Sequence, residues 1–116
     1  MNSFCKIYIS SKTNERDIWK VANAIKMPFL GNVFVYLDVN EEFDADKEIL
    51  FPDGFLFFKF LLEIELKNEA MNDDYIKYIG LVLKELWKKG ISAVASSDFE
   101  MMLPNNGGYN SKEVSW

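Results

Sequence analysis

Apolar and polar residues alternate along three segments of the chain, which is the pattern of strands that bury one side of a sheet. In segment 4–10 the odd positions Cys5, Ile7 and Ile9 are the apolar side. Segment 33–40 repeats the pattern, again with its odd positions apolar. In segment 55–66 every even position is apolar, and its length of twelve residues suggests a bulge or bend near 59–62. A fourth strand is predicted over 91–99, where small residues such as Ala93 and Ala95 lie.

Two further segments show the helical period of about 3.6 residues. Asn14 is a capping residue for the first helix, which places Ile18, Ala22 and Ile25 on one side and ends before Pro28. Asn72 and Gly90 mark the start and the end of the second helix. Its predicted apolar stripe consists of Tyr75, Ile79, Val82, Leu83 and Leu86.

The predicted elements follow one another as βαββαβ, with an acidic, exposed connection over 41–48. Right-handed crossovers then pair strand 1 with strands 3 and 4. We therefore predict an α+β, ferredoxin-like sandwich: a four-stranded antiparallel sheet of order 4-1-3-2 with both helices on one face. Residues 1–103 form the single predicted domain, and residues 104–116 form a loosely held C-terminal tail.

This arrangement leaves the second face of the sheet open, and that face is rich in aromatic residues. Solvated sheet faces are ordinarily polar, and a large exposed apolar patch marks an interface. We predict a non-enzymatic domain that binds a protein or forms a homodimer through this face. In the alternative within one chain, the tail covers the face with Tyr109, Val114 and Trp116. The predicted binding residues are Tyr8, Phe34, Tyr36, Phe55, Phe57 and Lys59.

Charge and composition exclude several classes of function. The net charge of −5 opposes binding to nucleic acid and to anionic membranes. No apolar run approaches the ~20 residues that span a bilayer, and the N-terminus lacks the layout of a signal peptide. The lone Cys5 suits a reducing compartment, so we expect a cytoplasmic protein in which Cys5 is a buried apolar residue.

The chain contains no histidine, which removes catalytic triads and imidazole ligands to metals. Glu63 with Glu65, and Asp98 with Glu100, are spaced to share a side of a strand, where they could hold a metal or transfer protons. Solvated charges that protect sheet edges are the preferred interpretation. The segment 44–46 resembles part of a calcium loop but lacks the later glycine and glutamate. We therefore predict no catalytic residue, no metal site and no cofactor.

Segments 6–10 and 54–60 resemble the two signature strands of the RNA-recognition motif. That resemblance implies base stacking on Tyr8, Phe55 and Phe57. The chain departs from the motif at Asp53, where the family has Lys or Arg, and at Leu56, where the family has a small residue. The acidic charge also opposes phosphate binding, so RNA binding is a secondary prediction.

A second resemblance covers most of the chain. The segments 53–58, 63–65, 86–90, 93–100 and 103–104 are similar to small uncharacterised bacterial proteins of about this length. Small acidic proteins of this kind include immunity proteins that neutralise toxins, and acidity favours binding to basic nuclease toxins. The resemblance thus implies an immunity-type role as an alternative.

Overall fold

The alternating segments form the strands of a single sheet. The computed structural model describes residues 4–25, 33–49, 53–66 and 73–108. The strands are β1 (Cys5–Ile9), β2 (Val33–Val39), β3 (Phe60–Leu66) and β4 (Ala93–Ser96). The helices are α1 (Glu15–Ala24) and α2 (Asp73–Lys88), with short 3-10 helices η1 (Asp53–Phe57), η2 (Glu100–Met102) and η3 (Pro104–Gly108).

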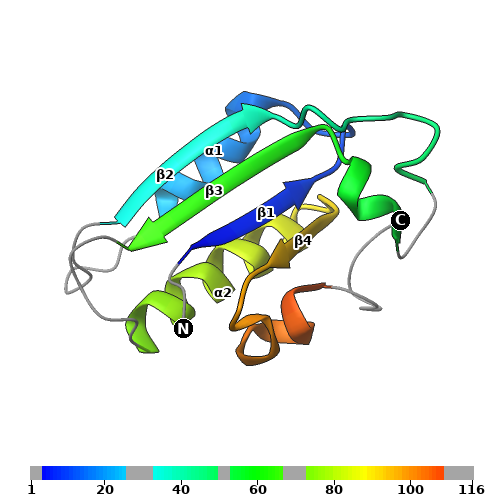
Figure 1. Cartoon of the computed structure of the whole chain (residues 1–116). Helices are drawn as coiled ribbons and strands as arrows, with labels where there is room; N and C mark the ends of the chain where they lie inside the picture. Colours follow the sequence, from blue (N-terminus) through cyan, green and yellow to red (C-terminus); the bar gives the residue numbers. More distant parts are fainter. Residues whose placement is uncertain (1–3, 26–32, 50–52, 67–72, 109–116) are drawn as a thin grey trace.

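The sheet has the strand order β2-β3-β1-β4, and all three pairs of neighbouring strands are antiparallel. This is the predicted order 4-1-3-2 written in the other direction, so the α+β class and the antiparallel four-stranded sheet are confirmed. Figure 1 looks onto the open face of the sheet, with α1 and α2 both behind it. The two helices therefore share one side, as the element order and right-handed crossovers predicted.

The core lies between the sheet and the helices. On the central strands the side chains that point toward the helices have exposed fractions of 4% or less. α2 supplies the other half of the core with Tyr75, Ile79, Val82, Leu83 and Leu86, each fully buried. The hydroxyl of Tyr75 donates to the carbonyl of Ile64 at 3.0 Å, which satisfies a polar group inside this apolar layer. The predicted stripe of the second helix is thus confirmed.

Local capping explains where the helices begin and end. The side chain of Asn14 accepts a hydrogen bond from the backbone N–H of Asp17 at 2.9 Å, so the predicted cap of α1 is confirmed. α2 is followed by Gly90 at φ 76°, the left-handed conformation that glycine adopts without strain. The other predicted cap, Asn72, lies outside the described residues.

The prediction of a continuous strand over 55–66 is wrong in its first part. Residues 53–57 form η1, and β3 begins only at Phe60. Leu56 consequently does not join the helix-covered side of the sheet but is 46% exposed. The chain bends at Lys59, directly before β3 begins, which agrees with the bend predicted near 59–62.

Hydrogen bonds from the segment after β2 hold η1 out of the sheet. The buried amide of Asn40 donates through Nδ2 to the carbonyls of Leu56 and Phe58, at 3.0 and 2.9 Å. The backbone N–H of Asp44 donates to the carbonyl of Phe57. These bonds occupy carbonyls that a longer strand would offer to a neighbouring strand. Distant partners therefore override the local alternation.

The last strand is also shorter than predicted, because β4 ends at Ser96 and the chain then turns into η2 and η3. η3 packs against α2 and β4, although we expected the tail from residue 104 to be loosely held. A Cβ on Gly107 would lie 2.9 Å from the carbonyl oxygen of Ala95, and one on Gly108 would lie 2.7 Å from that of Ala93. Residues 109–116 of the tail, with the covering residues proposed there, lie outside the described part of the chain.

Neither helix of the described segments combines the length and the apolar character that crossing a membrane requires.

Replacing Asn40 by Asp tests the role of its amide. The side chains have nearly the same shape, but a carboxylate cannot donate to the carbonyls of Leu56 and Phe58 and would place its charge against both. We expect the free energy of unfolding at pH 7, measured by urea denaturation, to fall by about 2–4 kcal/mol. Asn23→Asp on the exposed side of α1 is the control and should lower it by no more than about 1 kcal/mol, the cost of an acid in the last turn of a helix. Equal losses in both variants would contradict the role given to Asn40.

Candidate interaction surface

The open face of the sheet is built from cross-strand rows of side chains. Across it, Lys6 lies opposite Ser96 of β4 and Glu63 of β3, and Glu63 lies opposite Tyr36 of β2. In the neighbouring row Tyr8 lies between Val94 and Leu61, and Asp38 follows on β2. Aromatic, aliphatic and charged side chains are therefore intermixed on this face. It is less uniformly aromatic than the sequence suggested.

The structure divides the six predicted binding residues into two groups. Tyr8, Phe34 and Tyr36 lie on strands and point to the open face, as predicted. Phe55 and Phe57 lie in η1, and Lys59 precedes β3. The segment that resembles the second RNA-recognition strand is therefore not a strand at Phe55 and Phe57, the two residues expected to stack on bases.

η1 covers one end of the open face. The ring of Phe55 packs edge-on against that of Tyr8, with ring centroids 5.5 Å apart and planes at 76°. Burial, together with the nearby carboxylate of Glu63, raises the pKa of the Tyr8 hydroxyl. Val94, opposite Tyr8, is only 1% exposed. This end of the face is therefore covered within the chain.

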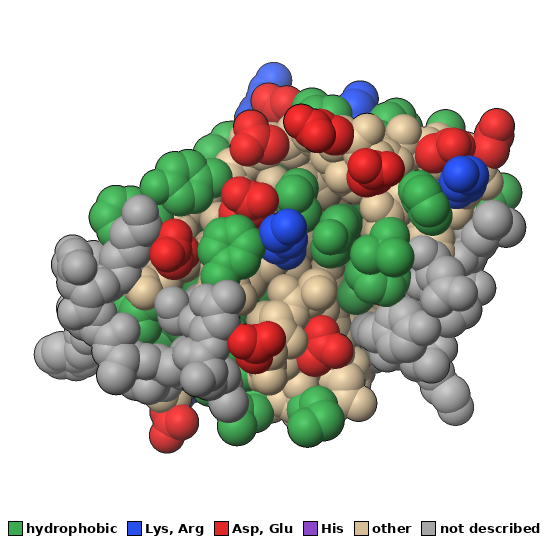
Figure 2. Space-filling model, viewed as in Figure 1, with side chains coloured by type: hydrophobic (Ala, Val, Ile, Leu, Met, Phe, Trp, Pro, Cys, Tyr) green, Lys and Arg blue, Asp and Glu red, His purple; other side chains and the backbone are tan. Residues whose placement is uncertain are grey.

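Two other aromatic side chains of the open face are on β2, and both are exposed to solvent. Phe34 is 39% exposed and Tyr36 is 46% exposed. Beside them on the open face are the acids Asp38, Glu63 and Glu65. Figure 2 shows this side of the molecule, where hydrophobic side chains are interspersed with acidic ones. We name the surface formed by Phe34, Tyr36, Asp38, Glu63 and Glu65 the β2–β3 patch.

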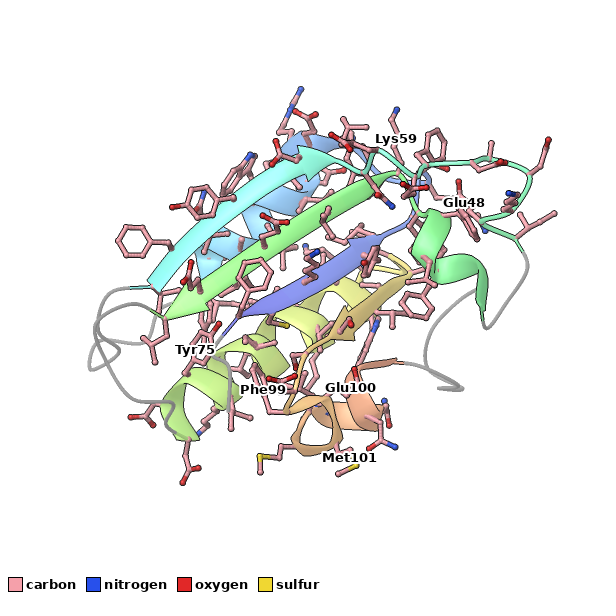
Figure 3. All side chains as sticks on the ribbon, in the orientation of Figure 1. Glu48, Lys59, Tyr75, Phe99, Glu100 and Met101 are labelled. Atoms are coloured by element: carbon pink, nitrogen blue, oxygen red, sulfur yellow. The ribbon has the colours of Figure 1, made fainter. Side chains whose placement is uncertain are left out.

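A buried carboxylate, which the sequence analysis placed in an exposed connection, joins the segment after β2 to the segment after β1. Glu48 is 7% exposed and accepts hydrogen bonds from the hydroxyl of Ser10 and from both the backbone N–H and the hydroxyl of Ser11. Figure 3 shows Glu48 beside η1 at the end of the sheet. The exposed acids around it in the sequence give no signal of this role, because its partners are more than thirty residues away in the chain.

A concave region lies away from this face, between the start of α1 and the end of α2. It has a volume of about 390 Å³ and is lined in part by Lys12, Lys20 and Lys89. The carboxylate of Asp17 lines it too and accepts a hydrogen bond from Asn14. An acid of the chain itself thus lies at this helix terminus, where the helix dipole favours negative charge.

The predicted carboxylate pairs are arranged differently from each other. Glu63 and Glu65 both lie on β3 and share the open face. Asp98 and Glu100 follow the end of β4, so the expectation that they share a strand is wrong. Glu100 instead accepts a long hydrogen bond from the backbone N–H of Ser97 at 3.4 Å. Within the described residues no three metal-ligating side chains of the His, Cys, Asp or Glu types come together.

Cys5 is fully buried on the helix-covered side of β1. Burial raises the pKa of its thiol to about 12, an effect that a hydrogen bond with Ser97 partly offsets and the charge of Glu100 increases. Such a thiol stays protonated at neutral pH and behaves as a small apolar side chain, as predicted.

No known protein family, no curated protein and no solved structure shows a significant match to this chain. The resemblances drawn from short segments therefore stay predictions. What the structure itself defines is an α+β protein with a four-stranded antiparallel sheet and two helices.

Thiol labelling tests the environment of Cys5. The rise in pKa from 9.0 to about 12 lowers the thiolate fraction at pH 8 by about a thousandfold. We expect an aromatic disulfide reagent to modify native Cys5 at least that much more slowly than the thiol of a Ser96→Cys variant, which is exposed at the end of β4. Comparable rates at the two positions would contradict the burial of Cys5.

The raised pKa of Cys5 also makes the free energy of unfolding depend on pH. The unfolded chain ionises this thiol at a lower pH than the folded chain does. The stability that the neutral thiol provides is therefore fully present below about pH 9 and declines as the pH rises toward about 12.

Proposed function

We propose that the chain is a non-catalytic association domain with a ferredoxin-like fold, and that it self-associates through the β2–β3 patch. One observation carries the proposal: Phe34 and Tyr36 lie on the same face of one strand with 39% and 46% of their surfaces exposed. Large aromatic side chains are enriched in protein interfaces, and removing them from water is favourable. The element order and the strand order 2-3-1-4 support the ferredoxin-like topology.

The charges of the patch favour a protein over RNA. Asp38, Glu63 and Glu65 flank the two exposed rings, and they would repel phosphates at low salt. Tyr8 is in contact with Phe55 and so does not offer the open ring that base stacking needs. If the partner is a different protein, these acids favour a basic one, which is the kind of partner that an immunity-type role requires.

Sedimentation equilibrium tests this proposal directly. We expect the wild-type chain to form dimers reversibly below about 100 µM, and Phe34→Glu to raise the dissociation constant at least tenfold, which is a loss of about 1.4 kcal/mol. The new carboxylate would replace a buried apolar contact and add charge to an already acidic patch.

Leu81→Glu is the matched control. Leu81 has the same exposed fraction as Phe34, 39%, but lies on α2, on the other side of the molecule. This variant should dimerise like the wild type. A monomeric wild-type chain would refute self-association, and equal weakening in both variants would show that the patch has no special part in it.

A further inference from the structure

The two edges of the sheet differ in what covers them. At the β4 edge, the carbonyl of Ala93 accepts a hydrogen bond from the indole Nε1 of Trp87 at 2.9 Å. Gly107 and Gly108 of η3 lie against the carbonyls of Ala95 and Ala93 so closely that a Cβ would collide with them. The chain thus covers this short edge itself, which is how proteins prevent sheets from pairing edge to edge.

The β2 edge is longer and, among the described residues, β2 pairs only with β3. It runs for seven residues without proline or lysine. Figure 1 shows it along the border of the sheet, with α1 behind it. A long apolar edge of this kind is a template for pairing with another strand.

The hydrogen-bond pattern shows which backbone groups of β2 point outward. The N–H of Asn40 donates to the carbonyl of Lys59, which places residue 40 in a hydrogen-bonded pair with β3. Because these pairs alternate along antiparallel strands, residues 34, 36 and 38 also direct their N–H and C=O groups toward β3. The backbone groups of Val33, Val35, Leu37 and Val39 therefore point away from the sheet.

β2 is also the strand that the chain buries least. The helix-facing side chains of β1 are 0% exposed, whereas Val33, Val35 and Leu37 at the equivalent positions of β2 are only partly buried. On the other face Phe34 and Tyr36 are exposed, and Val39 at the strand end is 52% exposed. Both sides of β2 therefore have apolar surface that a neighbouring strand would cover.

We propose that β2 pairs antiparallel with β2 of a second copy of this chain, about a two-fold axis at Tyr36. This proposal rests on the self-association proposed above and specifies its geometry. Val33 lies opposite Val39 of the second copy, and Val35 opposite Leu37, so the outward backbone groups meet in hydrogen-bonded pairs. Tyr36 lies opposite its own copy in a non-hydrogen-bonded pair on the open face.

The order of residues along β2 makes the strand complementary to itself, which favours a second copy of the chain as the partner at this edge. With the axis at Tyr36, all seven residues are paired, and each Asp38 lies opposite Phe34 of the other copy. With the axis at Asp38, two carboxylates would lie directly opposite each other, which is destabilising. With the axis at Val35 or Leu37, fewer residues would pair. The two sheets then form one continuous sheet, and the two β2–β3 patches become neighbours across the axis.

Cysteine cross-linking tests this register. Cα atoms of a non-hydrogen-bonded antiparallel pair are about 4.5 Å apart, within the range of a disulfide. We expect Tyr36→Cys to form a covalent dimer under mild oxidation, and Phe34→Cys alone to remain largely uncross-linked. An equimolar mixture of Phe34→Cys and Asp38→Cys should cross-link between the two variants. The native Cys5 is buried and protonated, so it does not compete.

A proline on the edge tests the backbone pairing separately. In Val35→Pro the lost N–H points outward, so pairing with β3 is retained and the fold should persist by circular dichroism. We expect its dimer dissociation constant to rise at least tenfold in sedimentation equilibrium.

The outcomes separate the two proposals. A monomeric wild-type chain would overturn both of them. A wild-type dimer that Val35→Pro leaves intact, or that cross-links through Phe34→Cys as readily as through Tyr36→Cys, would overturn the edge pairing and leave self-association through the β2–β3 patch standing.

Discussion

Burial of the helix-facing sides of β1 and β3 is the interaction on which the rest of the structure depends. Ile7, Leu62 and Ile64 are 0% exposed, and α2 covers them with a continuous apolar stripe. Since side chains alternate along a strand, burying one side determines which residues form the open face. β1 and β3 are the central strands of the sheet, and β2 and β4 are its edges.

The two edges of the sheet are covered to different extents, and so are the two ends of its open face. One end of the face is covered by η1, which Asn40 joins through hydrogen bonds to the segment after β2. Glu48, farther along that segment, joins it through hydrogen bonds to the segment after β1. The β4 edge is covered by η3. In the part of the chain that the structure describes, the exposed aromatic side chains and the unpaired backbone edge of the sheet both lie on β2. This coincidence is the physical basis of both functional proposals.

Much of the fold could be predicted because its signals are local. The Asn14 cap depends on residues three positions apart, and the α2 stripe on a period of 3.6 residues. The strand order followed from the element order and the handedness of crossovers. The misassigned part of strand 3 has a different origin: alternation continues through Leu56 and Phe58, but hydrogen bonds from Asn40 hold the backbone there in a turn.

The sequence by itself determined the class of the fold, the helices and the apolar side of each strand, because these depend on spacing within short segments. It also indicated Phe34 and Tyr36 as part of an open face. Only the tertiary structure decided that Phe55 covers Tyr8, that Glu48 is buried, and that η3 covers the β4 edge while no described residue pairs with the outer edge of β2. Those outcomes depend on contacts between residues distant in the chain, and alternation along a strand contains no information about them.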